Sequence, residues 1–166
     1  NGVAFGSGSS NGITQGTFVA VGAHGALYSS PDFNAWTTPT WTALTNLGSA
    51  ALYAATYQGS LYVAVGASGT ILTSGDTLTW TQQTSDTTMN LYGTGINGAG
   101  VVVAVGQAGA IVASANGTAW TALTPPAAAN GNDLYCVAFG NHTWVVVGNG
   151  GTLLTSANGV TWTAPT

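Results

Sequence analysis

The sequence has 166 residues, 45% of them hydrophobic, and its only charged side chains are four aspartates, which give a net charge of −4. Contacts to phosphate depend on Lys and Arg, and this chain has neither, so its composition excludes nucleic acid and attraction to an anionic membrane surface. No apolar run reaches 18 residues, so we expect no membrane insertion.

A repeat with a period in the low forties runs through the chain. The phrase "TSANGVTWT" recurs in looser forms and places tryptophans with spacings of 44, 40 and 42 residues, at Trp36, Trp80, Trp120 and Trp162. A second landmark, "VAVG" or "VVVG", keeps the same spacings and ends at Gly22, Gly66, Gly106 and Gly148. Such a period in strand-like sequence is typical of propeller blades. We predict an all-β fold, a β-propeller with four blades of four antiparallel strands, forming a single domain (1–166) with repeats at approximately 1–46, 47–89, 90–130 and 131–166.

Each repeat begins with two predicted strands. The first covers 134–139 in the last repeat and recurs from Leu52 and Leu91 and, clipped, at Val3. Its small residues fit a crowded strand near a central axis: Ala54, Ala55, Gly93 and Thr94. The second strand, "TWVVVG" and its relatives, is apolar along its length, which predicts burial on both faces. In the first repeat, the insert "GSGSSNGITQ" separates these two strands.

A G-x-x-G pattern follows the second strand in every repeat. Two residues between glycines predict a tight hairpin in which glycine supplies positive φ. The third strand alternates apolar and polar residues. After it come Ser, then Asp or Asn two residues later, then Trp four residues after that. We expect the Asp or Asn side chain to accept hydrogen bonds from N–H groups of its own turn, while the Trp fills the core.

These turns resemble a known family. The pattern S-x-D-x-G-x-x-W is the Asp-box of neuraminidase-type (BNR) repeats, and "VAVGxxGxIxxSxxGxxWT" is similar to propeller repeats of photosystem II assembly factors, sialidase-like propellers and secreted bacterial proteins. The resemblance covers nearly the whole chain and implies a structural turn away from any active site. The sequence departs from the motif at Asn34, Leu78, Asn116 and Asn158. The structural Asp-box residues are then Ser30, Asp32, Trp36, Ser74, Asp76, Trp80, Ser114, Asn116, Trp120, Ser156, Asn158 and Trp162.

The first repeat is incomplete at its start, where Asn1 and Gly2 stand in the places of Tyr135 and Cys136. A clipped strand leaves unpaired backbone groups at an edge, which a neighbouring chain or the chain end would cover. We expect the four repeats to close one ring. The alternatives are half of an eight-bladed dimer and a fragment of a longer propeller.

We predict no catalytic residue, no metal site and no cofactor. Sialidase activity, which the resemblance implies would need Arg and Glu, is excluded because both are absent. Asp86 and Asp133 are the only carboxylates outside the Asp-boxes, and they lie in loops that join repeats. His24 and His142 lie in predicted turns, with no second ligand at metal spacing. Cys136 aligns with small residues and is expected to be a small buried thiol.

Aromatic residues are the remaining candidates for recognition. Trp41 lies in a linker outside the repeat pattern, where it could stack on a sugar or a partner chain, or cap the base of a blade. Trp144 aligns with apolar residues of the other repeats and is expected in the core. The tyrosines that recur in the first strand are expected in the core or lining the axis: Tyr53, Tyr92 and Tyr135.

Two N-x-T sequons begin at Asn116 and Asn141, both in predicted turns, and mark possible glycosylation sites. Low charge means that copies repel each other weakly. From this we predict a non-enzymatic extracellular or cell-surface protein: a subunit of a surface layer, sheath or filament, or an adhesive domain. Its partners would be further copies of itself or other surface proteins. The alternative is a carbohydrate-binding, lectin-like propeller. A chaperone-like assembly factor is a third hypothesis, disfavoured because the resemblance implies cationic patches that this chain lacks.

Overall fold

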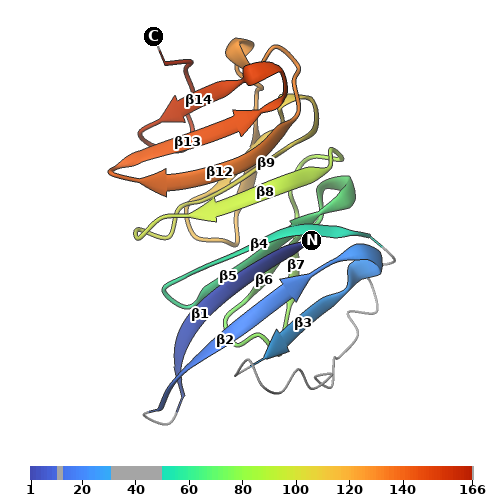
Figure 1. Cartoon of the computed structure of the whole chain (residues 1–166), viewed down its shortest axis with the longest axis vertical. Helices are drawn as coiled ribbons and strands as arrows, with labels where there is room; N and C mark the ends of the chain where they lie inside the picture. Colours follow the sequence, from blue (N-terminus) through green and yellow to red (C-terminus); the bar gives the residue numbers. More distant parts are fainter. Residues whose placement is uncertain (11–12, 31–49, 166) are drawn as a thin grey trace.

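The computed structural model describes residues 1–10, 13–30 and 50–165. The described chain is all-β and contains four antiparallel sheets that follow one another in the sequence (Figure 1). The first sheet contains β1 (Gly2–Ser10), β2 (Ile13–Val21) and β3 (Leu27–Ser30). The second contains β4 (Leu52–Gln58), β5 (Leu61–Gly66), β6 (Ile71–Ser74) and β7 (Thr81–Gln83).

The third and fourth sheets repeat this plan. The third contains β8 (Leu91–Ile96), β9 (Val102–Gly106), β10 (Ile111–Ser114) and β11 (Trp120–Leu123). The fourth contains β12 (Leu134–Gly140), β13 (Thr143–Gly148) and β14 (Leu153–Ser156). In place of a further strand, an isolated bridge joins Thr155 to Thr163. The prediction of four strands in every blade is therefore not met by the first and fourth sheets as described, and 31–49, where the first sheet's fourth strand was expected, lies outside the described residues.

The predicted insert in the first repeat extends a hairpin. Strands β1 and β2 pair without interruption from Gly2 opposite Val21 to Ser10 opposite Ile13. The polar segment that we expected to separate two strands therefore prolongs both of them. Every residue in the paired part of this segment carries a backbone N–H and C=O, and these groups can pair across the hairpin whatever the side chains are.

The four sheets do not close into a ring. The first strands of consecutive sheets contact one another, β1 with β4, β4 with β8 and β8 with β12. Figure 1 places the first and last sheets at opposite ends of the longest axis of the molecule. The expected closed four-bladed ring is thus wrong for the described residues, in which the fourth sheet lies away from the first.

Each of the first three sheets packs one of its two faces against the sheet that follows it in the sequence. We call the face toward the following sheet the forward face and the opposite one the rear face. Val63, Val65 and Ile71 on the forward face of the second sheet are fully buried against the rear face of the third, which contributes Val102 and Trp120. The same pattern joins the first sheet to the second and the third to the fourth. The core is therefore a series of three sheet-on-sheet layers, which is why the second strands are apolar on both sides.

The G-x-x-G segments form short 3₁₀ turns in which the predicted positive φ of glycine is confirmed at the second glycine of each pair but not at the first. The first glycine of each pair lies in extended backbone, and positive φ occurs at the residue before the second glycine, as at Ser68 (φ 53°), and at that second glycine, as at Gly69 (φ 71°). A Cβ on Gly106 would lie 1.9 Å from the carbonyl oxygen of Asn90. The first glycine is thus required by a close backbone approach at the start of the sheet's first strand.

The polar turns close the opposite end of the sheets. In the second sheet, Ser74 Oγ accepts a hydrogen bond from the Thr77 N–H (2.8 Å), and Trp80 Nε1 donates to the Thr77 carbonyl oxygen (3.1 Å). The third and fourth sheets repeat these bonds around Asn116 and Asn158. In all three repeats the Asp or Asn side-chain oxygen also accepts hydrogen bonds from two N–H groups of its own turn, as expected. Asp32 and Trp36, in the first repeat, lie outside the described residues, although Ser30 is described and fully buried.

Asp76 makes the second sheet's turn sensitive to pH. The backbone N–H of Thr79 donates to its carboxylate (2.7 Å), and with the Leu78 N–H it holds the pKa of Asp76 below the ordinary aspartate value of about 3.9 despite some desolvation. This contribution to stability is fully present above the pKa of the unfolded chain and is lost as pH falls through the lower pKa of the folded chain. We expect the urea midpoint to fall over that range of pH.

Asp76→Asn supplies the matched variant, because asparagine occupies the same place in the next two repeats. Its urea midpoint should fall less than that of the unmodified chain between pH 5 and the acid limit. Identical acid profiles for the two proteins would contradict a role for this carboxylate.

Candidate functional site

Three tyrosines form a ladder across the first strands of consecutive sheets. The pairing of β4, β8 and β12 with the following strand shifts register at one position, between Leu52 and Ala54 in β4 and at the equivalent points of the others. The shift is an irregularity of the bulge type, and the residue that it contains is each time a tyrosine. Ring centroids are 5.6 Å apart for Tyr53 and Tyr92, and 5.7 Å apart for Tyr92 and Tyr135.

The ladder depends on backbones that approach closely. A Cβ on Gly93 would lie 2.6 Å from the carbonyl oxygen of Tyr135, and one on Gly2 would lie 2.8 Å from the Cα of Ala54. The expected crowding of the first strands is confirmed at these positions. With the strands held so closely, rings from three sheets can contact in succession. In the described part of the chain, none of the three tyrosine hydroxyls makes a hydrogen bond, so these groups are available to a ligand.

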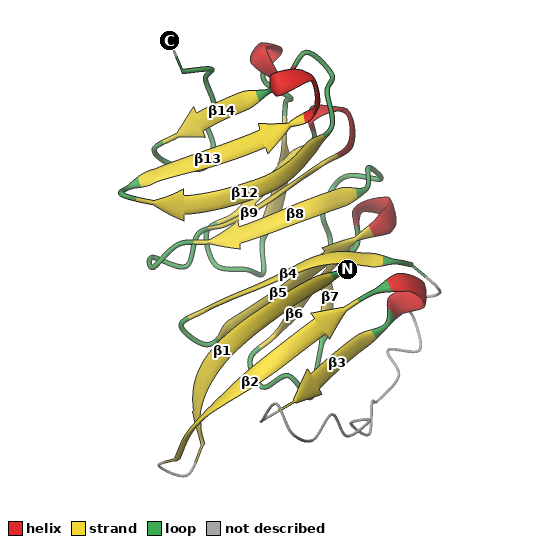
Figure 2. Ribbon diagram, viewed as in Figure 1, coloured by secondary structure: helices red, strands yellow, loops and turns green. Residues whose placement is uncertain are grey.

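The last rung is the most open. Tyr53 and Tyr92 are partly buried between their neighbours, whereas Tyr135 is 51% exposed. Because Leu52 pairs with Gly66, the ladder lies at the same end of the sheets as the 3₁₀ turns. Figure 2 shows these turns gathered along one side of the molecule. This side, with the ladder and the turns, is the candidate site.

Side chains in the loops before β8 and β12 join the turns of the second and third sheets to the next sheet. The Asp133 carboxylate, just before β12, accepts a hydrogen bond from the Ala108 N–H in the preceding sheet's turn (2.8 Å). Asn90, just before β8, accepts one from the Ser68 N–H in the same way (3.0 Å). Sequence reasoning placed Asp133 in a joining loop but missed this role, and it did not single out Asn90. Asn90 and Asp133 each stand immediately before the first strand of their repeat, so aligning the repeats at that position would have found both.

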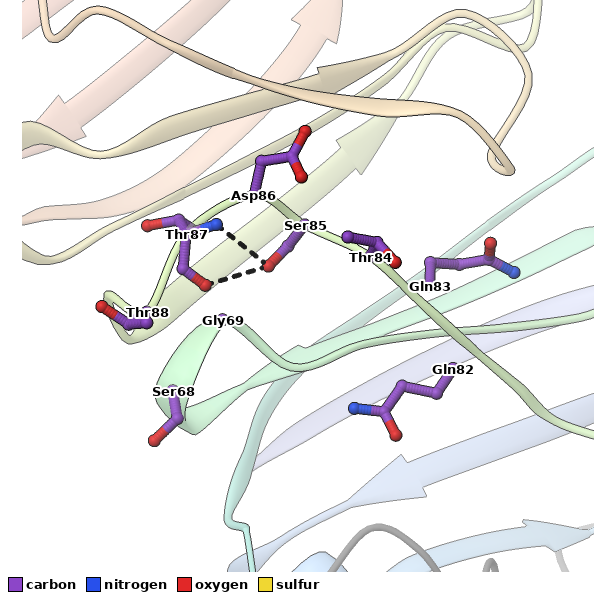
Figure 3. A pocket seen from close by; sticks show the side chains of 9 residues that line it. All are labelled: Ser68, Gly69, Gln82, Gln83, Thr84, Ser85, Asp86, Thr87 and Thr88. Carbon is purple, nitrogen blue, oxygen red and sulfur yellow. Dashed lines mark hydrogen bonds between the residues drawn. The ribbon is translucent and has the colours of Figure 1, made fainter.

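A polar pocket of about 780 Å³ opens at the same end of the second sheet (Figure 3). Ser85 Oγ donates to the Thr87 carbonyl oxygen (3.1 Å), and Gln83 Nε2 donates to Thr73 Oγ1 (2.7 Å), so part of its polar lining is already bonded. The pocket offers hydroxyl and amide groups and one carboxylate, from Ser68, Gly69, Gln82, Gln83, Thr84, Ser85, Asp86, Thr87 and Thr88. These groups suit hydrogen bonds to a peptide backbone.

The titratable side chains of the described residues are dispersed. Within 1–10, 13–30 and 50–165, no three His, Cys, Asp or Glu side chains are close enough to hold a metal ion. His24 and His142 are both exposed in turns, as predicted. Asp86 lies in the pocket of the second sheet, whereas Asp133 joins the third and fourth sheets. No helix in the described chain is both long and apolar enough to cross a membrane.

The predicted burial of Cys136 is wrong. This residue was expected to be buried, and the structure exposes it. The equivalent residue of the third sheet, Gly93, is covered by the backbone of the next sheet at Tyr135. Cys136 lies in the fourth sheet, where no described sheet packs over the same position.

The remaining residues singled out in the sequence have three different outcomes. Trp144 is fully buried, as its alignment predicts. Asn116 and Asn141 are exposed, and their glycosylation stays a prediction. Trp41, the candidate recognition residue, lies outside the described residues.

Comparisons with known proteins identify the fold. No family model matches the chain, and no curated protein matches it. A solved structure of YCF48 bound to a D1 peptide aligns with 98% of this chain at a TM-score of 0.64 and 18% identity. YCF48 from Cyanidioschyzon merolae aligns with 69% at a TM-score of 0.58 and 17% identity. YCF48 is a photosystem II assembly factor with a β-propeller fold. The likeness shows propeller architecture, and the assignment of the polar turns to the Asp-box family stays a prediction.

The chain spans only part of these neighbours, 51% of the D1-bound structure and 37% of the other. These two structural neighbours contradict the function that we predicted from the sequence. The expected subunit of a surface layer, sheath or filament, the adhesive domain and the lectin-like alternative are contradicted by neighbours that are assembly factors, one of them bound to a peptide. The expected extracellular or cell-surface location stays a prediction.

Proposed function

We propose that this chain is a non-enzymatic binding module that holds an extended segment of a partner protein against its tyrosine ladder. The observation that carries the proposal is the succession of Tyr53, Tyr92 and Tyr135, with ring centroids 5.6 and 5.7 Å apart and hydroxyls that make no hydrogen bond within the described residues. Tyrosine combines a large apolar face with a polar tip, which is why it is enriched where proteins bind each other.

The propeller neighbour bound to a D1 peptide supports a peptide as the ligand class, since it aligns over nearly the whole of this chain. The polar pocket near the 3₁₀ turn of the second sheet adds amide and hydroxyl groups at the same end of the sheets. Peptide backbones need such donors and acceptors when they leave water.

Charge sets which peptides bind best. The chain has four aspartates and no cationic side chain, so an acidic segment would meet only like charge. We therefore propose a neutral or basic segment as the preferred partner. A lysine-bearing peptide should bind more tightly than a glutamate-bearing one of the same length, and added salt should reduce the difference.

The test is isothermal titration calorimetry with the D1 peptide of the neighbour structure and with a pair of synthetic 15-residue peptides that differ only in Lys against Glu. Tyr92→Ala should weaken binding about tenfold or more, because truncating a tyrosine at a binding hot spot costs on the order of 2 kcal/mol. Leu78→Ala is the matched control, since Leu78 is 68% exposed at the opposite end of the second sheet. Absence of heat with all three peptides, or equal affinity of Tyr92→Ala and the unmodified chain, would refute the proposal.

A further inference from the structure

The forward face of the fourth sheet is an exposed copy of a surface that the other sheets bury. Val103, Val105 and Ile111 of the third sheet are at most 1% exposed, because the fourth sheet covers them. Their equivalents in the fourth sheet are Val145, Val147 and Leu153, which are 37%, 45% and 41% exposed. The apolar side chains are the same in kind, and only the cover is missing.

The rear face of the first sheet is open in a complementary way. Val3 and Phe5 are 65% and 55% exposed, although the equivalent positions in the other sheets lie between packed layers. Phe5 also forms an aromatic pair with Phe18, with ring centroids 4.4 Å apart. The rear face of the second sheet carries the same pair as Tyr57 and Tyr62, also 4.4 Å apart, packed over Gly6 of the first sheet. The rear face of the fourth sheet carries it as Phe139 and Trp144, 5.0 Å apart.

Both halves of the repeated interface therefore stand exposed at the two ends of one chain. Neither set of exposed residues contains a charged side chain, so two copies meet without desolvating a charge. The solved propeller that aligns with 98% of this chain uses only 51% of its own length, so that propeller has about as much chain as two copies of this one.

We propose that two copies of this chain form one ring of eight sheets. The forward face of the fourth sheet of each copy packs on the rear face of the first sheet of the other, at two equivalent interfaces related by a two-fold axis. The contacts would be apolar and sheet-on-sheet, of the same kind as those between the third and fourth sheets. This inference does not depend on the proposed peptide binding, which concerns another surface and is measured differently.

Light scattering coupled to size-exclusion chromatography tests it. The chain has a mass of 16.4 kDa, and the expected result is a species of twice that mass that does not grow at higher concentration. Val147→Asp should shift the mass to that of a monomer. The matched control is Leu78→Asp, at an exposed leucine outside both faces, which should remain a dimer. A monomeric unmodified chain would overturn the proposal, and so would a series of larger species, because it would mean that the ring does not close.

A second variant distinguishes head-to-tail packing from self-pairing of one face. Phe5→Asp, on the opposite face, should also give a monomer. Each variant keeps the face that the other has lost, so an equimolar mixture should recover a dimer joined by a single interface. That dimer should dissociate on dilution, because one interface lacks the effective concentration that a closed ring provides. Failure of the mixture to associate would overturn the pairing of these two faces. Circular dichroism spectra matching the unmodified chain show that each variant is folded.

Discussion

Replacing Trp120 by alanine is expected to lower the free energy of unfolding by about 3–5 kcal/mol. The indole is 5% exposed and packs in the layer between the second and third sheets. Its Nε1 donates to the Gly117 carbonyl oxygen (3.0 Å), so the substitution removes core volume and also leaves a buried acceptor without its donor. Urea denaturation followed by circular dichroism measures the change.

Two further variants separate these contributions. Trp120→Phe keeps most of the ring volume but loses the Nε1 bond, so its loss should be smaller. Thr121→Ala changes the exposed neighbour and should stay within about 0.5 kcal/mol of the unmodified chain. If Trp120→Ala were as stable as Thr121→Ala, the indole would not hold the two sheets together.

Gly106→Ala is expected to cost about 3 kcal/mol, at the upper end for overpacked sites, although it adds one methyl group. That methyl carbon would lie 1.9 Å from the Asn90 carbonyl oxygen and 2.8 Å from the Leu91 Cα, and both are backbone atoms. The strands must separate, which strains the hydrogen bond from the Gln107 N–H to the Asn90 carbonyl oxygen (2.9 Å). Thermal unfolding should show a lower midpoint.

The control is Gly98→Ala, in an exposed turn where an added Cβ has no atom within 4 Å and φ is not positive. Its midpoint should match that of the unmodified chain. Equal midpoints for Gly98→Ala and Gly106→Ala would show that the strand start tolerates displacement, contrary to the tight approach described.

Much of the fold could be predicted because the repeat carries it. Two landmarks in constant register predicted the order of strands, and the continuous apolar run of the second strand predicted that it lies between layers, as β5 and β9 do. The role of the first glycine in G-x-x-G could not be predicted, since Gly106, at the end of β9, is constrained by the carbonyl oxygen of Asn90, sixteen residues earlier in a loop with no pattern of its own. Turn chemistry alone predicted positive φ at glycine in this turn, which the second glycine has and Gly106 does not.

The open ring and the exposure of Cys136 share a cause. A repeat pattern describes the relation of each sheet to the next, and it is silent about the two end faces. Cys136 was compared with Gly93 and Ala54, whose positions are covered by a following sheet. Only the arrangement in space shows that, among the described residues, the fourth sheet has no such cover.

The candidate site was partly visible in the sequence. The three tyrosines were aligned and expected in the core or at the axis, but their contact depends on a register shift that no residue pattern announces. The predicted function went wrong for another reason. The prediction took the scarcity of charge to favour self-assembly as a surface material. The lack of Lys and Arg argues against anionic ligands, but it does not favour one kind of neutral partner over another.

The order of strands also determines how the chain folds. Every described strand pairs with the strand before or after it in the sequence, so each sheet forms by closing short loops. Folding can begin in any one sheet and spread to its neighbours. The second and third sheets are supported on both faces, so their amide hydrogens should exchange most slowly with solvent, and the two end sheets should open first.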